Sequence, residues 1–410
     1  MNKYLFLLAS SLILCGCSAA PISAVQTGSP SASPQISSDQ HRTIDDISLS
    51  ETPLTDFENL SAANTNDGSI VPSGSGDGLL KLGTAVRYCD PDVSDQFAYY
   101  CFEPGCKHHD PTCHSYIGNA QSFIAYQGIW YYTRQNDSNQ FEIVCHNPET
   151  NERKVIAQYE RSDDGRIWEV IGSMILSHGL LYVSIQRFET AEDTMQQTST
   201  IYTDTINLQT FERKKLENCN DRDGFICGNG QKAVIVRSEP RESVNGSEYV
   251  FNELSVLDLT SGEKVKITDS DQGYFNFSDP YQLSNQDKLV YIESNNIHLL
   301  DLGTMENQVI YSSPKILIRA WFFGNHVRFL EKETDGSSLV ESMIDLDGNN
   351  RQDYPELIDN EENVMKFGYQ YLTEHGQIGR VMQGNNLISG WISEENYLRC
   401  DLDQVVSAKA

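Results

Sequence analysis

The chain has 410 residues, with 58 acidic against 30 basic side chains and a formal net charge of −28. Such an excess of carboxylates repels phosphate backbones and anionic lipid headgroups, which excludes nucleic-acid binding and charge-driven attachment to membranes. Hydrophobic residues make up 39% of the chain and the mean hydropathy is −0.44, which excludes a protein with many membrane spans.

The first residues of the chain predict export. Lys3 precedes an apolar run over residues 4–14, which is too short to span a bilayer as a helix because that takes about 20 residues. A basic tip followed by a short apolar segment is typical of a secretory signal, which we place at residues 1–16. The ending Leu14-Cys15-Gly16-Cys17 resembles the bacterial lipobox. This resemblance implies a lipidated Cys17 and a lipid-anchored protein on the extracytoplasmic side of the cell membrane; an ordinary signal peptide is the alternative.

Residues 17–76 differ in composition from the rest of the chain. They are rich in Ser, Thr and Pro, and Phe57 is the only aromatic residue after Cys17 in this range. Such a segment buries too little apolar area to offset the entropy lost on ordering. We therefore expect a disordered tether between the lipid anchor and a folded domain over residues 77–410, with the membrane contacted only through the anchor.

A repeated pattern runs through residues 77–410. An apolar strand ends in Asp or Asn, a short turn follows, and then comes a charged strand, as in Val256-Leu257-Asp258-Leu259-Thr260-Ser261-Gly262-Glu263-Lys264. A turn-then-strand signal such as Gly128-Ile129-Trp130-Tyr131-Tyr132 precedes most copies. The Asp or Asn positions, which we call the anchors, lie 43 to 60 residues apart at Asp90, Asn147, Asn207, Asp258, Asp301, Asp345 and Asp401.

Units of this length without helical periodicity have room for about four antiparallel strands each. Repeats of roughly 40–50 residues built in this way are typical of β-propeller blades, and a closed ring explains how one domain absorbs so many residues. We predict an all-β fold, a β-propeller of about four-stranded blades. Seven anchors favour seven blades; six follows if the two terminal segments share one blade.

The repeat signatures also resemble a known family. The Gly-x-x-Tyr-Tyr and Asp-Leu-Thr-Ser-Gly-Glu motifs are similar to those of bacterial lipoprotein β-propellers, which are loosely similar to TolB-like and kelch-like propellers. The resemblance covers residues 78–403 and extends to a Cys-x4-Cys-x-His-x4-Cys pattern between the first and second units. It implies an architecture and no particular activity.

This pattern lies in a Cys/His-rich loop at residues 101–114. Cys101, Cys106 and Cys113 with His108 offer three thiolates and one imidazole, the ligand set of a closed, structural zinc site. His109 or His114 could replace His108. A loop closed by disulfides is the alternative, because an exported location permits oxidation, and free thiols are a third.

Two further cysteine pairs are candidates for disulfides. Cys219 and Cys227 flank a turn-rich segment and could close a loop, whereas Cys89 and Cys400 lie in the first and last units and could join the ends of the ring. Either bridge requires Cα atoms within about 7 Å of each other.

No catalytic motif for a serine hydrolase, a phosphate-binding loop or a zinc protease is present in the sequence. We therefore expect a non-catalytic binding or scaffolding propeller for a protein, peptide or glycan. The alternative is an extracytoplasmic glycan-active enzyme, a hydrolase or lyase, with carboxylates around the propeller channel. Two or more buried, mutually close acids in the channel would favour the enzyme.

Overall fold

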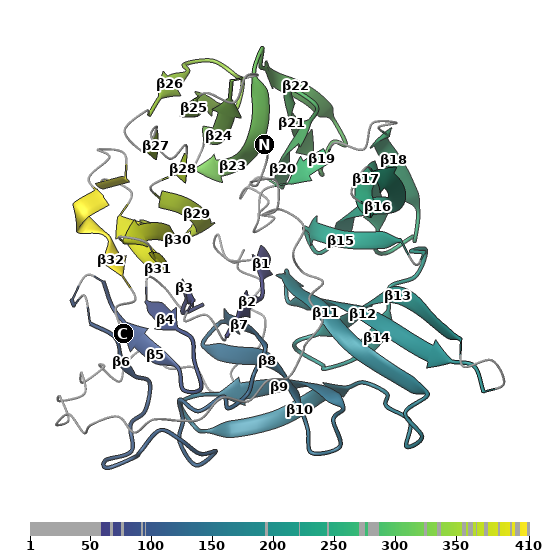
Figure 1. Cartoon of the computed structure of the whole chain (residues 1–410), viewed down its shortest axis with the longest axis vertical. Helices are drawn as coiled ribbons and strands as arrows, with labels where there is room; N and C mark the ends of the chain where they lie inside the picture. Colours follow the sequence, from purple (N-terminus) through teal and green to yellow (C-terminus); the bar gives the residue numbers. More distant parts are fainter. Residues whose placement is uncertain are drawn as a thin grey trace.

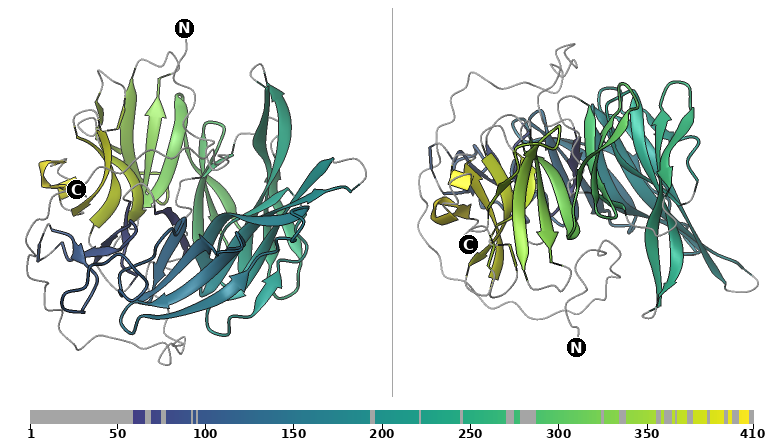
Figure 2. Two further views of the ribbon diagram at one scale, coloured as in Figure 1. Left: turned by 60° about the horizontal axis from the view of Figure 1, so that its bottom comes forward. Right: turned by 90° about the horizontal axis from the view of Figure 1, so that it is seen from above.

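The structure, a computed structural model, describes residues 59–407. Within that range it leaves out short gaps at 66–68, 75–77, 92, 95, 193–195, 221, 244–245, 270–274, 278–286, 324–325, 334–337, 355–357, 360–363, 366, 373–375, 384–385, 394–395 and 398–401. The described part is built from antiparallel β-sheets that form a ring (Figure 1; two further views in Figure 2). It contains no helix long and apolar enough to cross a membrane.

Seven sheets of four or five strands form seven blades, which confirms both the all-β propeller and the favoured blade number. Blade 1 consists of β3 (Ile70–Pro72), β4 (Leu79–Lys81), β5 (Arg87–Cys89) and β6 (Ala98–Tyr99). Blade 2 consists of β7 (Ser122–Tyr126), β8 (Ile129–Gln135), β9 (Phe141–Asn147) and β10 (Glu152–Gln158). Blade 3 consists of β11 (Ile167–Ser177), β12 (Leu180–Thr190), β13 (Gln197–Asn207) and β14 (Arg213–Lys215).

The remaining blades follow in chain order around the ring. Blade 4 consists of β15 (Asp223–Gly228), β16 (Lys232–Ser243), β17 (Gly246–Asp258) and β18 (Lys264–Asp269). Blade 5 consists of β19 (Phe275–Phe277), β20 (Lys288–Glu293), β21 (Asn296–Asp301) and β22 (Asn307–Ser312). Blade 6 consists of β23 (Ile316–Phe323), β24 (His326–Lys332), β25 (Leu339–Asp345) and β26 (Gln352–Asp353).

Blade 7 closes the ring. It consists of β29 (Phe367–Leu372), β30 (Gly376–Gln383), β31 (Asn386–Ser393) and β32 (Val406–Ser407), with the 3₁₀ turn η3 (Leu402–Gln404) before its last strand. A separate two-stranded hairpin, β27 (Ile358–Asp359) and β28 (Val364–Met365), precedes it. Because blades 1 and 7 are separate sheets, the six-bladed alternative with a shared closing blade is wrong.

The boundary predicted between tether and folded domain is also wrong, because strands begin at β1 (Asn59–Ser61) and continue through β2 (Ala63–Asn64) and β3. β1 pairs with β11 and β2 pairs with β7, so this segment adds a fifth strand to the inner edges of blades 3 and 2. Figure 1 shows it at the centre of the ring. The backbone groups of residues 175–177 and 122–123 on two sheet edges thereby gain strand partners.

Hydrophobic clusters between neighbouring blades form the core, because a blade has two faces and cannot bury them alone. Leu176 and Leu181 of blade 3 pack with Ile143 of blade 2, for example. The ring closes in the same way, since Ile378 of blade 7 shares a cluster with Leu79 of blade 1.

The Asp and Asn anchors of the repeat, as distinct from the lipid anchor, have a clear structural role. Except for Asp401, which lies outside the described residues, each ends or directly follows the third strand of its blade. Asp258 Oδ1 accepts hydrogen bonds from the backbone N–H groups of Thr260 at 2.9 Å and Ser261 at 2.7 Å, which fixes the turn into the fourth strand. Asn207 does the same for Gln209 and Thr210.

One turn within blade 6, between β25 and β26, requires glycine where it packs against blade 5, and this gives a first prediction. Gly348 has φ = +82° and a Cβ atom there would lie 1.9 Å from the carbonyl oxygen of Ile310, whereas Gly128 has φ = +76° and open space around it. We expect Gly128→Ala to lower the free energy of unfolding by about 1–2 kcal/mol through backbone strain alone. Gly348→Ala should lower the free energy of unfolding clearly more than Gly128→Ala does, as measured by chemical denaturation. Equal losses in the two variants would contradict the close packing of Gly348 against Ile310.

Candidate metal centre

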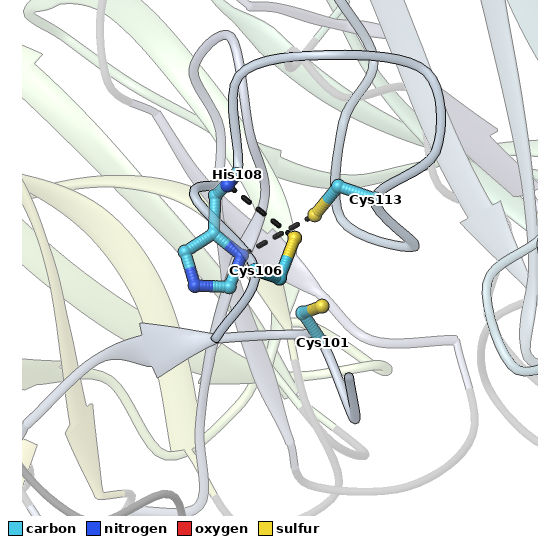
Figure 3. Close-up of side chains that lie close together, drawn as sticks. All are labelled: Cys101, Cys106, His108 and Cys113. Carbon is cyan, nitrogen blue, oxygen red and sulfur yellow. Dashed lines mark hydrogen bonds between the residues drawn. The ribbon is translucent and has the colours of Figure 1, made fainter. Parts of the chain in front are cut away.

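The predicted Cys/His-rich loop is the crossover from blade 1 to blade 2, between β6 and β7. Its cysteines and His108 converge as predicted: the thiols of Cys101, Cys106 and Cys113 and a ring nitrogen of His108 all lie within 4.8 Å of one another (Figure 3). Tetrahedral zinc with Zn–S bonds of about 2.3 Å places its ligand atoms roughly 3.8 Å apart. This Cys3His cluster could therefore hold a metal ion.

Two turns bring the four residues together. Pro104 and Gly105 occupy the centre of a turn in which the Cys106 N–H donates to the Glu103 carbonyl at 3.2 Å, and Gly105 has φ = +78°. Proline followed by a left-handed glycine is the preferred sequence of a type II turn. A second turn forms where the Cys113 N–H donates to the Asp110 carbonyl at 3.1 Å.

His108 is the fourth member of the cluster. Its Nδ1 lies 3.3 Å from Cys113 Sγ, and its backbone N–H donates to Cys106 Sγ at 3.4 Å. It also has a left-handed backbone with φ = 57°, which is uncommon for a residue other than glycine and costs stability unless the surroundings fix it. The alternatives are placed elsewhere: His109 is exposed beside Asp110, and His114 Nδ1 contacts the Pro148 carbonyl at 2.7 Å.

Burial sets the acid–base properties of the cluster. Cys101 is 7% exposed and Cys113 is 0% exposed. Burial raises the pKa of the Cys101 thiol to about 12. At Cys113 burial acts in the same direction, but hydrogen bonds from Ser115 and Cys106 outweigh it and lower the pKa. Burial, with Arg87 nearby, lowers the pKa of His108, which keeps the imidazole in the neutral form that binds metals.

Blade 2 holds the loop in place through Arg153 on β10. Its Nη2 donates to the carbonyl oxygens of Cys113 at 2.9 Å and Tyr116 at 3.0 Å, and its Nη1 donates to the Pro111 carbonyl. Asn151 adds a hydrogen bond to the Thr112 carbonyl at 3.0 Å. The cluster thus connects two blades and is fixed from both.

This contact gives a second prediction. Arg153→Met removes charge-assisted hydrogen bonds worth about 1.5–3 kcal/mol each, so the loop should open more often. In the chelator-treated Arg153→Met chain we expect Cys113 to react with iodoacetamide about tenfold faster, or more, than in the chelator-treated wild type. The reaction is followed by peptide mass spectrometry. Lys154→Met on the same strand, whose ammonium lies over the Phe211 ring, is the control and should leave the rate unchanged. Equal rates in both variants would show that Arg153 does not hold the loop.

The other cysteine predictions have different outcomes. Cys219 and Cys227 are both free thiols and pack in different clusters, Cys219 against the interface of blades 3 and 4 and Cys227 in that of blades 4 and 5. The structure therefore does not contain the Cys219–Cys227 bridge. Cys89 is buried at the end of β5, and Cys400 lies outside the described residues, so their pairing stays a prediction. Cys17 also lies outside them.

Buried acids that lie close together in the channel would favour an enzyme, so the buried carboxylates of the described residues bear on that alternative. There are six, and each forms an ion pair with an arginine or lysine. The pairs are Glu142–Arg134, Glu169–Arg187, Asp204–Arg213, Asp223–Lys264, Glu331–Arg351 and Glu341–Arg328, with N–O distances between 2.6 and 3.1 Å.

Sequence reasoning missed the residues around the metal centre. Arg153 holds the loop, and Arg87 and Tyr99 of blade 1 lie beside His108. Arg87 and Tyr99 are cross-strand partners, so their proximity depends on strand register. Spacing along the chain gives no signal for contacts of this kind.

No family model and no curated protein sequence matches the chain. Among solved structures, an oligogalacturonate lyase from Vibrio parahaemolyticus is similar with a TM-score of 0.49 and 9% identity, over 82% of this chain and 91% of that one. Dipeptidyl peptidase 4 from Porphyromonas gingivalis has a TM-score of 0.47 and 8% identity, over 82% and 59%. This chain thus spans about three fifths of the peptidase. TolB from Acinetobacter baumannii is similar with a TM-score of 0.30 and 11% identity, over 75% and 66%.

Proposed function

We propose that the chain is an exported lipoprotein, anchored through Cys17, whose propeller is a non-catalytic binding or scaffolding module for a protein, peptide or glycan. The Cys3His loop holds a structural zinc ion. The observation that carries the binding role is the pairing of the buried carboxylates with cations. A glycosidase needs one carboxylic acid and one carboxylate facing the substrate, and carboxylates neutralised by arginine or lysine are poorly suited to either task.

The chemistry of the donor set supports zinc. Three sulfurs and one imidazole complete a tetrahedron without an open position, the arrangement of structural sites and not of catalytic ones. When bound, such an ion cross-links the loop without taking part in a reaction. A disulfide fits the cluster less well, because three free thiols cannot all pair with one another and the His108 ring approaches Cys113 at 3.3 Å.

Binding without turnover is tested on the full chain. The full chain is incubated with a panel of polysaccharides and peptides, and both the bound fraction and the appearance of cleavage products are measured. We expect saturable binding of at least one class with no product. New reducing ends, unsaturated sugars or cleaved peptides, formed in proportion to the protein added, would contradict the proposal.

Anchoring is tested separately. The wild-type chain should incorporate a labelled fatty acid and sediment with membranes, whereas Cys17→Ser should lose the label. Cys15→Ser, which changes a neighbouring thiol, is the matched control and should keep the label. Labelling of the Cys17→Ser chain at the wild-type level would place the anchor elsewhere.

A further inference from the structure

A pocket of about 350 Å³ lies directly beside the metal centre. Its walls come from β4, β5, β6, the 82–85 turn and the Cys/His-rich loop, so it lies between blade 1 and the crossover to blade 2. The lining includes Lys81, Arg87, Tyr99 and His108.

The pocket is basic in an otherwise acidic protein. The chain has 58 acidic and 30 basic residues, yet the lining contains Lys81 and Arg87 and no carboxylate. These two residues are direct cross-strand partners on β4 and β5, so their side chains project from the same face. Like charges in this position repel each other, and an anion bound between them would attract both. Burial and the charge of Arg87 accordingly lower the pKa of Lys81.

Tyr99 contacts both Arg87 and His108. The Arg87 guanidinium lies over the Tyr99 ring, with Cζ 4.7 Å from the ring centroid, and Nη2 donates to the Tyr99 hydroxyl at 3.1 Å. The His108 ring is stacked on Tyr99 with centroids 4.1 Å apart and an angle of 19° between the planes. A guanidinium has five N–H donors in a rigid fork, and this contact uses one, so others are left for a ligand.

His108 links the pocket to the metal centre. Its Nδ1 points towards the cysteine sulfurs, and Figure 3 shows the second ring nitrogen on the side away from them. A histidine that binds a metal through one nitrogen carries its proton on the other, where it donates a hydrogen bond. With zinc bound, as proposed above, the ring would add a fixed N–H donor next to Lys81 and Arg87.

We propose that this pocket binds an oxyanion, the carboxylate or phosphate group of the ligand that the propeller recognises. Arg87 and Lys81 provide charge and hydrogen-bond donors, and Tyr99 keeps the guanidinium oriented. The inference deepens the proposed binding role, because it assigns the ligand an acidic group and places its contact beside the Cys/His-rich loop.

The proposal is tested on the full chain purified with its metal. Binding of inorganic phosphate is followed by ³¹P line broadening, and acetate is tested as a competitor at constant ionic strength set with sodium chloride. We expect saturable binding that is weakened about tenfold or more in both Lys81→Met and Arg87→Met, because each variant removes one charged donor. Lys266→Met, an exposed lysine paired with Asp269, is the matched control and should bind as the wild type does.

The two anion sources give different results. Displacement of phosphate by acetate at comparable concentration points to a carboxylate ligand, and phosphate binding that acetate does not displace points to a phosphorylated one. No saturable binding, or equal binding by wild type, Lys81→Met and Arg87→Met, would overturn the proposal. Zinc is measured in every sample. A wild type that holds zinc and binds neither anion therefore refutes the oxyanion site and leaves the proposed zinc site standing. A chain without zinc that binds the anion refutes the zinc site alone.

Discussion

A Cys113→Ser variant of the full chain is expected to lose the zinc ion proposed for the Cys3His cluster and to melt well below the wild type. Cys113 is fully buried, and its sulfur contacts both His108 and Ser115. A structural zinc contributes its binding free energy to folding, because the unfolded chain has no preformed site. We expect zinc to fall from about one ion per chain to nearly none and the melting temperature to drop by roughly 5–10 °C.

Cys227→Ser is the matched control for this prediction. Cys227 is equally buried, at 0% exposure, but lies in the core between blades 4 and 5. Its replacement also buries a hydroxyl group and should lower stability, yet zinc should stay at the wild-type level. Metal analysis by mass spectrometry separates the two cases. A Cys113→Ser chain that keeps its zinc would remove Cys113 from the ligand set.

Replacing Arg328 with methionine is expected to be among the most destabilising single changes in the ring. Arg328 Nη2 lies 2.8 Å from Glu341 Oε1, and both side chains have 0% exposure. Tyr397, from the blade 7 side, donates a hydrogen bond to Glu341, and the guanidinium lies 4.3 Å from the ring centroids of Tyr354 and Tyr397. Removing one partner leaves a buried charge without compensation and should cost about 3–5 kcal/mol in urea denaturation.

The pH dependence of that loss follows from Glu341. Burial raises its pKa, with Arg328 acting in the opposite direction. Without Arg328 the pKa rises further, so the folded state holds a proton that the unfolded chain releases above about pH 4.3. Stability of the variant should therefore fall as the pH rises, and its deficit should be larger at about pH 8 than at about pH 5.

A double variant provides the control. Arg328→Met combined with Glu341→Gln removes both charges, so it should recover part of the lost stability and show no extra deficit at high pH. If the single and double variants have the same free energy of unfolding at both pH values, the buried pair does not act as described. The loss would then reflect packing alone.

The propeller could be predicted because its repeat has a local cause. At Asn147, Asn207, Asp258 and Asp301 the anchor's side-chain oxygen accepts hydrogen bonds from the backbone N–H groups of the following turn, so the motif is visible in the sequence. The convergence of Cys101, Cys106, His108 and Cys113 could be predicted for a similar reason, since a Pro-Gly turn joins near neighbours.

The strands β1 and β2, the basic pocket and the placement of Cys219 and Cys227 could not be predicted, because they depend on contacts between distant segments. β1 and β2 are short strands in a Ser- and Thr-rich segment, and they form because β11 and β7 offer open edges, so their sequence predicts a tether. The basic pocket needs the register that sets Lys81 opposite Arg87. Cys219 and Cys227 lie near each other in sequence but pack at different blade interfaces, which spacing alone does not reveal.

The most direct test of a closed Cys3His metal centre in this propeller is the metal and thiol content of the wild-type chain. The chain is purified without added metal, analysed for zinc, then unfolded with a chelator and titrated for thiols. We predict about one zinc ion per chain, released on unfolding, with Cys101, Cys106 and Cys113 all alkylated without prior reduction. A chain that contains no zinc and whose three cysteines react only after reduction would contradict the metal centre.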